Sequence, residues 1–168
     1  MNKVPKHWHW RADLRAEEGS GRLGPGVLID VDGVISDATH RQHYLDSRPR
    51  DWDGFFEAAA HDLPLIPGLA LLATFDRELT IVLLTARPLR IRPLTLDWLE
   101  RHNVVWDLLV MRPDGDNAPS SVTKLRAVEE LRAVGLEPRL AVDDDQNNVD
   151  AFSAAGIPAV YHHSGYYE

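Results

Sequence analysis

Residues 27–33 read VLIDVDG, a short apolar run that ends in two acids and a glycine. Side chains of a strand alternate between its two faces, so Asp30 and Asp32 emerge on the same side. Gly33 has no β-carbon and lets the chain turn sharply after the acids. The stretch therefore predicts a buried strand that presents two carboxylates at its carboxyl end.

The rest of the chain repeats this alternation of apolar strands and helices. Four further apolar segments predict strands at 79–85, 106–111, 139–145 and 158–163. Helical spacing, Pro67 and terminal glycines predict helices at 67–78, 92–102, 120–135 and 147–156. Strands that are apolar throughout and alternate with helices predict an α/β fold, a parallel sheet flanked by helices on both faces.

The length of 168 residues indicates one domain, which we place at residues 25–168. Residues 1–24 are charged and end in a glycine-rich stretch, so we expect an N-terminal arm or linker there. An alternative is that four residues of this arm bind single-stranded nucleic acid by charge and stacking: Lys6, Trp8, Trp10 and Arg11.

Composition excludes several classes of protein. The absence of cysteine excludes zinc fingers, disulfide scaffolds and thiol nucleophiles. No apolar run approaches the roughly 18 residues of a membrane span, and the first residues lack the apolar core of a signal peptide. We therefore expect a cytoplasmic protein with no membrane contact. The net charge of -8 argues against a large phosphate-coating surface but allows a local basic groove.

Groups capable of chemistry also follow the other predicted strands, and in a parallel sheet the ligand site lies outside the carboxyl ends of the strands. Thr85 and Arg87 end the second predicted strand, and Asp143, Asp144 and Asp145 end the fourth. A single acid or hydroxyl at a strand end is usually a turn former or a helix cap, and Asp145 fits a cap for the next helix. Several such groups at one sheet edge nevertheless predict a site.

Lys124 is the one lysine after residue 6, in a chain whose other basic residues are almost all arginine. It lies near the expected start of a helix, where a cation is disfavoured by about 0.3–1 kcal/mol. A solvated helix residue is the structural alternative. A site that demands a compact ammonium and has no room for a guanidinium explains both features, so we place Lys124 with the acids.

The motifs DVDG, LLTAR, the isolated lysine and LAVDDD, in this order, resemble those of the haloacid dehalogenase-like (HAD) hydrolases and span residues 27–163. The resemblance implies a Rossmann-like sheet and Mg²⁺-dependent phosphoryl transfer. It implies that Asp30 is the nucleophile, which forms an aspartyl-phosphate, and that Asp32 is the general acid and base.

The same resemblance implies roles for the remaining groups at the sheet edge. Thr85 and Lys124 would bind the phosphoryl oxygens, and Lys124 would also neutralise Asp30. The implied metal ligands are four carboxylates: Asp30, Asp32, Asp143 and Asp144. Of the last two, we favour Asp144 as the direct ligand.

A finer resemblance is to the 3′-phosphatase domain of phage-type polynucleotide kinase-phosphatases. It rests on Arg41 in THRQHY, on Arg87 in the second motif, on LAVDD and on a C-terminal SGYY. It implies that Arg41 and Arg87 bind the substrate phosphate and backbone. Ser120, four residues before Lys124, stands where we expect an acid. The sequence has no kinase loop G-x-x-x-x-G-K-[ST], so a kinase would be a separate partner.

The segment 36–65, between the first motif and the next helix, is short, so we expect little or no cap over the site. Within it, DWDGFFEAAA (51–60) predicts one helix. An open site admits a polymer end, and six arginines are candidates for a basic rim around it: Arg41, Arg48, Arg50, Arg87, Arg90 and Arg92.

Several functions remain open at this point. The first is a Mg²⁺-dependent phosphatase that removes 3′-phosphates from nucleic-acid ends, as in nucleic acid repair. The alternative is a small-molecule HAD phosphatase, such as a nucleotidase with a nucleotide substrate. A phosphorylated receiver domain also combines acids, Thr and Lys, but its Lys ends a strand, whereas Lys124 lies on a predicted helix. A binding module without catalysis is the last possibility.

Overall fold

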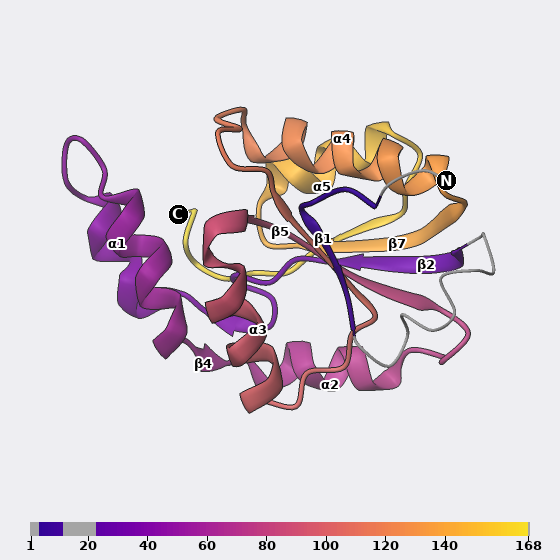
Figure 1. Cartoon of the computed structure of the whole chain (residues 1–168), viewed down its shortest axis with the longest axis horizontal. Helices are drawn as coiled ribbons and strands as arrows, with labels where there is room; N and C mark the ends of the chain where they lie inside the picture. Colours follow the sequence, from indigo (N-terminus) through magenta and orange to yellow (C-terminus); the bar gives the residue numbers. More distant parts are fainter. Residues whose placement is uncertain (1–3, 12–22, 168) are drawn as a thin grey trace.

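The strand predicted from VLIDVDG lies at the centre of the sheet in the computed structural model, which describes residues 4–11 and 23–167. Five strands run parallel in the spatial order β6 (Leu108–Arg112), β5 (Thr80–Pro88), β2 (Gly24–Ile29), β7 (Leu136–Asp143) and β8 (Ala159–Tyr161). This order, with the chain starting in the middle and winding outward both ways, confirms the Rossmann-like α/β architecture (Figure 1).

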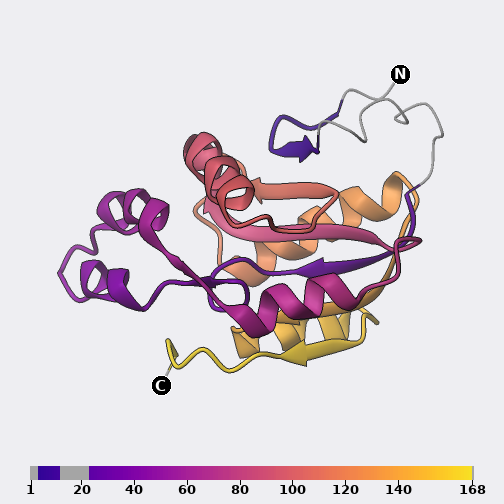
Figure 2. The same cartoon turned by 90° about the horizontal axis from the view of Figure 1, so that it is seen from below.

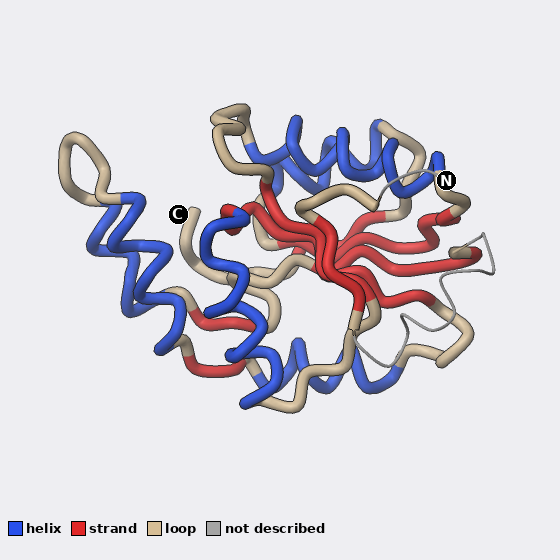
Figure 3. Tube along the Cα trace, in the orientation of Figure 1, coloured by secondary structure: helices blue, strands red, loops and turns tan. Residues whose placement is uncertain are grey.

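Helices cover both faces of the sheet, as the alternating pattern predicts (Figure 3). α2 (Ile66–Thr74) and α3 (Arg92–Arg101) pack on one face, and α4 (Ser120–Ala133) and α5 (Gln146–Ala154) pack on the other. A 3-10 turn, η4 (Leu89–Ile91), connects β5 to α3. In the described part of the chain, no helix combines the length and apolarity needed to cross a membrane.

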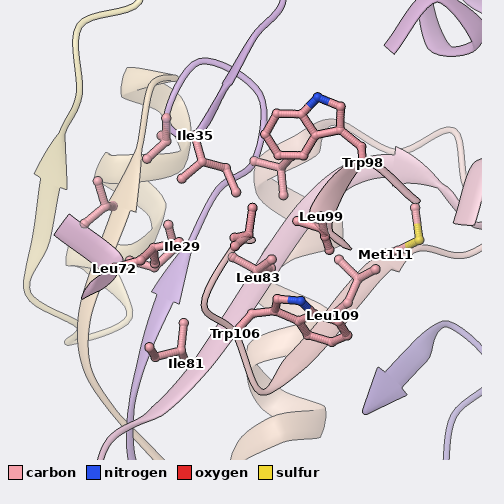
Figure 4. Close-up of a cluster of buried hydrophobic side chains, with 14 of the residues drawn as sticks. Ile29, Ile35, Leu72, Ile81, Leu83, Trp98, Leu99, Trp106, Leu109 and Met111 are labelled. Atoms are coloured by element: carbon pink, nitrogen blue, oxygen red, sulfur yellow. The ribbon is translucent and has the colours of Figure 1, made fainter. Parts of the chain in front are cut away.

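The strands are apolar throughout because both of their faces are covered. Leu83 of β5 packs with Leu72 of α2 and Trp98 of α3, in the cluster shown in Figure 4. Its neighbours Val82 and Leu84 point to the opposite face and pack in a second cluster with residues of α4 and α5. Burying both faces fixes the register of the strands, and so the positions of the polar residues that follow them.

A sixth strand, β1 (Trp8–Trp10), pairs antiparallel with β6 at the edge of the sheet. This strand lies within the segment that the sequence predicts as an arm or linker, of which residues 1–3 and 12–22 lie outside the described residues. Trp8 is 6% exposed and packs in the second cluster. The prediction that its ring stacks on nucleic acid is therefore wrong.

The segment after β2 forms a small helical insertion that projects from the end of the sheet where the C-terminus also lies (Figures 1 and 2). Its elements are β3 (Ser36–Asp37), η2 (Thr39–Leu45), α1 (Trp52–Glu57), η3 (Ala58–His61) and β4 (Leu63–Pro64). The predicted single helix over 51–60 is an α-helix that continues as a 3-10 helix, and η2 adds a further helical segment. β3 and β4 pair antiparallel and close the base of the insertion.

Candidate active site

The polar residues predicted from the strand ends meet at the carboxyl edge of the sheet. Asp30 follows β2, Thr85 lies in β5, and Asp143 ends β7 and is followed by Asp144. Lys124 reaches the same edge from α4. All five side chains belong to buried residues, and Lys124 is only 1% exposed. The structural alternative for Lys124, a solvated helix position, is therefore wrong.

Lys124 lies between two carboxylates from neighbouring strands. Its Nζ is 3.0 Å from Oδ2 of Asp30 and donates a hydrogen bond of 2.6 Å to Oδ2 of Asp143. Burial alone would lower the pKa of Lys124, but the charges of Asp143 and Asp30 outweigh it and hold the pKa above its usual value. The lysine is therefore a permanent cation in this site.

Three carboxylates form a compact cluster around this cation. Oxygen atoms of Asp30, Asp143 and Asp144 lie within 4.8 Å of one another. Burial raises the pKa of Asp30 well above its usual value, and the charges of the neighbouring acids add to this increase. Lys124 lowers the pKa but does not outweigh the other effects. Burial also raises the pKa of Asp144, to about 7. A hydrogen bond from Ser164 opposes this increase, and the negative charge of Asp143 adds to it. Burial and mutual repulsion thus make two of the three carboxyl groups hold their protons more tightly than usual.

The donor set of this cluster fits a hard divalent cation. Oδ2 of Asp144 is buried and has no hydrogen-bond partner among the described residues, so it is available as a ligand. A β-carbon on Gly33 would lie 2.0 Å from this oxygen, and Gly33 has φ of +77°. Both observations explain why glycine follows the acids. One ammonium cannot balance three ionised carboxylates, and carboxylate oxygens are ligands that Mg²⁺ prefers.

Asp143 is oriented by its neighbours as well as by Lys124. Its Oδ1 accepts hydrogen bonds from the backbone N–H of Asp145 at 3.1 Å and from Nδ2 of Asn148 at 2.9 Å. Nδ2 of Asn148 also lies 3.3 Å from Oγ of Ser120, at the position where the sequence predicts an acid. Asp145 caps α5 through the backbone N–H of Asn147, as the sequence predicts.

Asp32 is not part of the carboxylate cluster, because its side chain is held by two arginines. Nη2 of Arg41 and Nη2 of Arg87 each lie 2.6 Å from Oδ1 of Asp32, and Nε of Arg87 lies 3.0 Å from it. Burial would raise the pKa of Asp32, but Arg87 and Arg41 outweigh it and lower the pKa to about 2. The structure thus groups the side chain of Asp32 with the arginines, apart from Asp30, Asp143 and Asp144.

Asp62 is a site residue that the sequence reasoning missed. Its fully buried carboxylate accepts hydrogen bonds from Nε and Nη2 of Arg41 at 2.9 and 2.8 Å and from Nη2 of Arg87 at 3.0 Å. Oγ of Ser36 donates to it as well, at 2.5 Å. Asp62 belongs to no motif, and the only signal for it is the charge balance that two buried arginines require. Arg41 and Arg87 are both 0% exposed, so neither forms an exposed rim.

Thr85 and Lys124 line part of a cavity of about 450 Å³, whose lining includes Asp114 and Asp116 but not Asp30, Asp143 or Asp144. Oγ1 of Thr85 accepts a hydrogen bond of 3.1 Å from the backbone N–H of Arg87, which fixes the hydroxyl. The site therefore places a hydroxyl and an ammonium, both able to donate hydrogen bonds, beside a carboxylate cluster that fits a cation.

The C-terminal SGYY ties the end of the chain to the base of the insertion. The hydroxyl of Tyr166 accepts a hydrogen bond of 2.6 Å from the backbone N–H of Ala38 and donates one of 3.0 Å to Oδ1 of Asp37. Two residues earlier, Ser164 contacts Asp144. The last residues of the described chain therefore form one side of the site.

Comparison with known proteins agrees with this geometry. The family model described as the polynucleotide kinase PNKP phosphatase domain matches residues 25–167. No curated protein matches the chain. The resemblance found in the sequence is thereby confirmed at the level of the family.

Solved structures share the fold. A chain in the structure of the Pnkp1/Rnl/Hen1 RNA repair complex is 23% identical with a TM-score of 0.71, over 85% of this chain and 43% of that one. A second Pnkp1/Rnl/Hen1 complex gives 24% identity and a TM-score of 0.68, over 84% and 46% of the two chains. The class C acid phosphatase from Bacillus anthracis with tungstate bound is 16% identical with a TM-score of 0.60, over 92% and 73%. This chain thus spans less than half of the Pnkp1 chains.

Replacing Asp62 by Asn tests the charge balance of the buried arginines. Arg41 and Arg87 would then share Asp32 alone, and removing one partner of a buried ion pair costs about 3–5 kcal/mol. We expect the free energy of unfolding to fall by about that amount in urea titrations followed by circular dichroism. Glu137→Gln, which breaks an exposed pair with Arg139, should cost at most about 1 kcal/mol. An Asp62→Asn protein as stable as the Glu137→Gln control would contradict the assignment.

The raised pKa of Asp144 predicts how the metal-free protein responds to pH. Because its pKa of about 7 in the folded state exceeds the value of about 3.9 in an unfolded chain, the folded state binds the additional proton between these values. Stability therefore falls as pH rises through this range, by up to about 1.4 kcal/mol per pH unit. We expect the melting temperature without divalent cations to fall between about pH 5 and about pH 7, and Mg²⁺ to restore it.

Asp144→Asn is the control for this prediction, since an amide has no proton to lose in this range. Its melting temperature should depend less on pH and should gain less from Mg²⁺. If wild type and Asp144→Asn share one pH profile and neither responds to Mg²⁺, Asp144 is not a metal ligand.

Proposed function

Since this chain belongs to the family of polynucleotide kinase PNKP phosphatase domains, HAD-type hydrolases of phosphoric monoesters, we propose that it removes terminal 3′-phosphates from nucleic acids. The chemical step would pass through an aspartyl-phosphate on Asp30. The observation that carries the proposal is the buried constellation of Asp30, Lys124 and Asp143, with Asp144 beside them.

Asp30, Asp143 and Asp144 would hold Mg²⁺, whose charge would shield the nucleophile from the negative phosphoryl group. Support for this comes from the unpartnered Oδ2 of Asp144 and from the three carboxylates that converge there. Lys124 adds a fixed cation 3.0 Å from Asp30, which favours the ionised form of the nucleophile. The compact ammonium reaches Asp30 and Asp143 at once.

In the first step, a carboxylate oxygen of Asp30 attacks phosphorus, and the bond from phosphorus to the 3′-oxygen breaks. Asp32 donates the proton that the leaving 3′-oxygen needs. Thr85 and Lys124 would donate hydrogen bonds to the phosphoryl oxygens, and Lys124 lies 3.0 Å from the nucleophile. In the second step, Asp32 takes a proton from water, the water oxygen attacks phosphorus, and inorganic phosphate leaves Asp30 as a free carboxylate.

The arginines connect substrate binding to the acid. In the free protein Arg41 and Arg87 are engaged by Asp32 and Asp62, and the pKa of Asp32 is held at about 2. A substrate phosphate that draws an arginine away from Asp32 raises this pKa and makes the carboxyl a competent proton donor. Asp62 stays as the second partner of both guanidinium groups.

A substrate panel tests the proposed function. We expect kcat/KM for a 3′-phosphorylated oligonucleotide to exceed that for an aryl phosphate by about 10²–10⁴-fold, because two contacts from Arg41 and Arg87 add roughly 1.5–3 kcal/mol each. The 5′-phosphorylated isomer should be a poor substrate. The preference should decrease with added salt, since part of it comes from phosphate neutralisation.

Asp30→Asn is the control for contaminating activity and should abolish turnover of every substrate in the panel. Nucleoside 3′- and 5′-monophosphates distinguish the alternative function. If these mononucleotides are turned over as well as the oligonucleotide or better, the protein is a nucleotidase and the proposal fails.

A further inference from the structure

The insertion carries three aromatic rings in mutual contact. Ring centroids of Phe55 and Phe56 lie 5.3 Å apart with an edge-to-face geometry, and those of Trp52 and Phe56 lie 5.8 Å apart and stacked. Phe55 is buried, whereas Trp52 is 45% exposed in spite of its large apolar ring. The aromatic cluster thus runs from the interior of the insertion to its surface.

The buried end of this cluster touches the candidate active site. The guanidinium of Arg41 lies 4.3 Å from the centroid of the Phe55 ring. The same guanidinium donates to Asp32 at 2.6 Å. The exposed indole of Trp52 is therefore linked to the candidate active site through one phenyl ring and one arginine.

Two more arginines lie over the exposed part of the cluster. Arg50 is 5.8 Å from the centroid of Trp52, and Arg90 is 5.9 Å from that of Phe56. Arg90 donates to Asp53 at 2.5 Å. Within the described ranges, Arg50 has no carboxylate within ion-pair distance. Its charge is therefore free to meet an anion.

These contacts also revise the basic rim that the sequence predicts. Arg41 and Arg87 are buried, and Arg92 donates to the backbone carbonyl of Lys6. The remaining members of the rim, Arg48, Arg50 and Arg90, are exposed and belong to the insertion or to η4 next to it. The basic groups that stay accessible thus gather where the aromatic rings are.

We infer that the surface formed by Arg50, Trp52, Phe56 and Arg90, the stacking face, binds the unpaired nucleotides that precede the 3′-phosphorylated end of the substrate. This inference rests on the proposed function. An exposed ring flanked by guanidinium groups matches a single strand, whose bases offer free faces for stacking and whose phosphates pair with arginine. In a duplex, the bases are already stacked on one another, so we expect this surface to bind unpaired ends.

A series of substrates of increasing length tests the stacking face. For 3′-phosphorylated single strands of two to about eight nucleotides, kcat/KM of the wild type should rise with length and then level off. Trp52→Ala should lower kcat/KM for the longer strands roughly 5- to 100-fold, the loss expected for one stacked base. It should leave turnover of an aryl phosphate unchanged. Trp52→Phe, which keeps a ring, should retain most of the rise.

A plot of log kcat/KM against log salt concentration should become less steep in Arg50→Ala. We expect its slope to change by about 0.7, the contribution of one neutralised phosphate in a single strand. Arg139→Ala is the matched control, since Arg139 is an exposed arginine of β7 paired with Glu137 and lies outside the insertion. It should leave both the length series and the salt dependence as in the wild type.

Binding without turnover separates this inference from the proposed function. In an Asp30→Asn background, the affinity for a fluorescently labelled single strand is measured by anisotropy, with and without Trp52→Ala. Weaker binding on loss of the indole supports the stacking face whatever the enzyme hydrolyses. Equal affinity with and without Trp52, or an unchanged length series, overturns it. A wild type that turns over oligonucleotides no better than an aryl phosphate overturns the proposed function instead.

Discussion

A buried ammonium holds together the edge of the sheet on which the site is built. Lys124 contacts carboxylates from two neighbouring strands, Asp30 after β2 and Asp143 at the end of β7. Removing such charges from water costs several kcal/mol for each ion and is offset only by close partners with good geometry. One ammonium cannot balance three ionised carboxylates, so loss of the protons of Asp30 and Asp144 leaves negative charge that suits a divalent cation.

A second group of buried charges is neutral in itself and couples the insertion to the sheet. Arg41 from η2 and Arg87 from β5 share the carboxylates of Asp32 and Asp62. Because the backbone carbonyl of Asp62 also accepts a hydrogen bond of 2.8 Å from Nε1 of Trp98, the base of the insertion is fixed to the core. The two groups of buried charges therefore differ in what they can do. The acidic cluster suits a cation, whereas the neutral group of two arginines and two aspartates positions the side chain of Asp32.

The sequence predicts the fold and the meeting of polar residues at the strand ends because apolar strands and a lone lysine leave a local signal. Asp62 leaves none, since its importance comes from two arginines that are distant in the chain and buried by tertiary packing. For the same reason the sequence places Arg41 and Arg87 on a rim, whereas both are buried. The edge strand of Trp8 was missed because its three residues form a strand only through pairing with β6.

The proposed function depends most on Asp30 acting as a nucleophile with a metal bound at the acidic cluster. The most direct measurement is an acid-quenched reaction with an oligonucleotide that carries a radiolabelled 3′-phosphate, followed by peptide mapping of the protein. We predict label on the peptide that contains Asp30 when Mg²⁺ is present, and none after the metal has been chelated. Label on a different residue, or turnover with Mg²⁺ that never labels the protein, would contradict the role of Asp30 as the nucleophile.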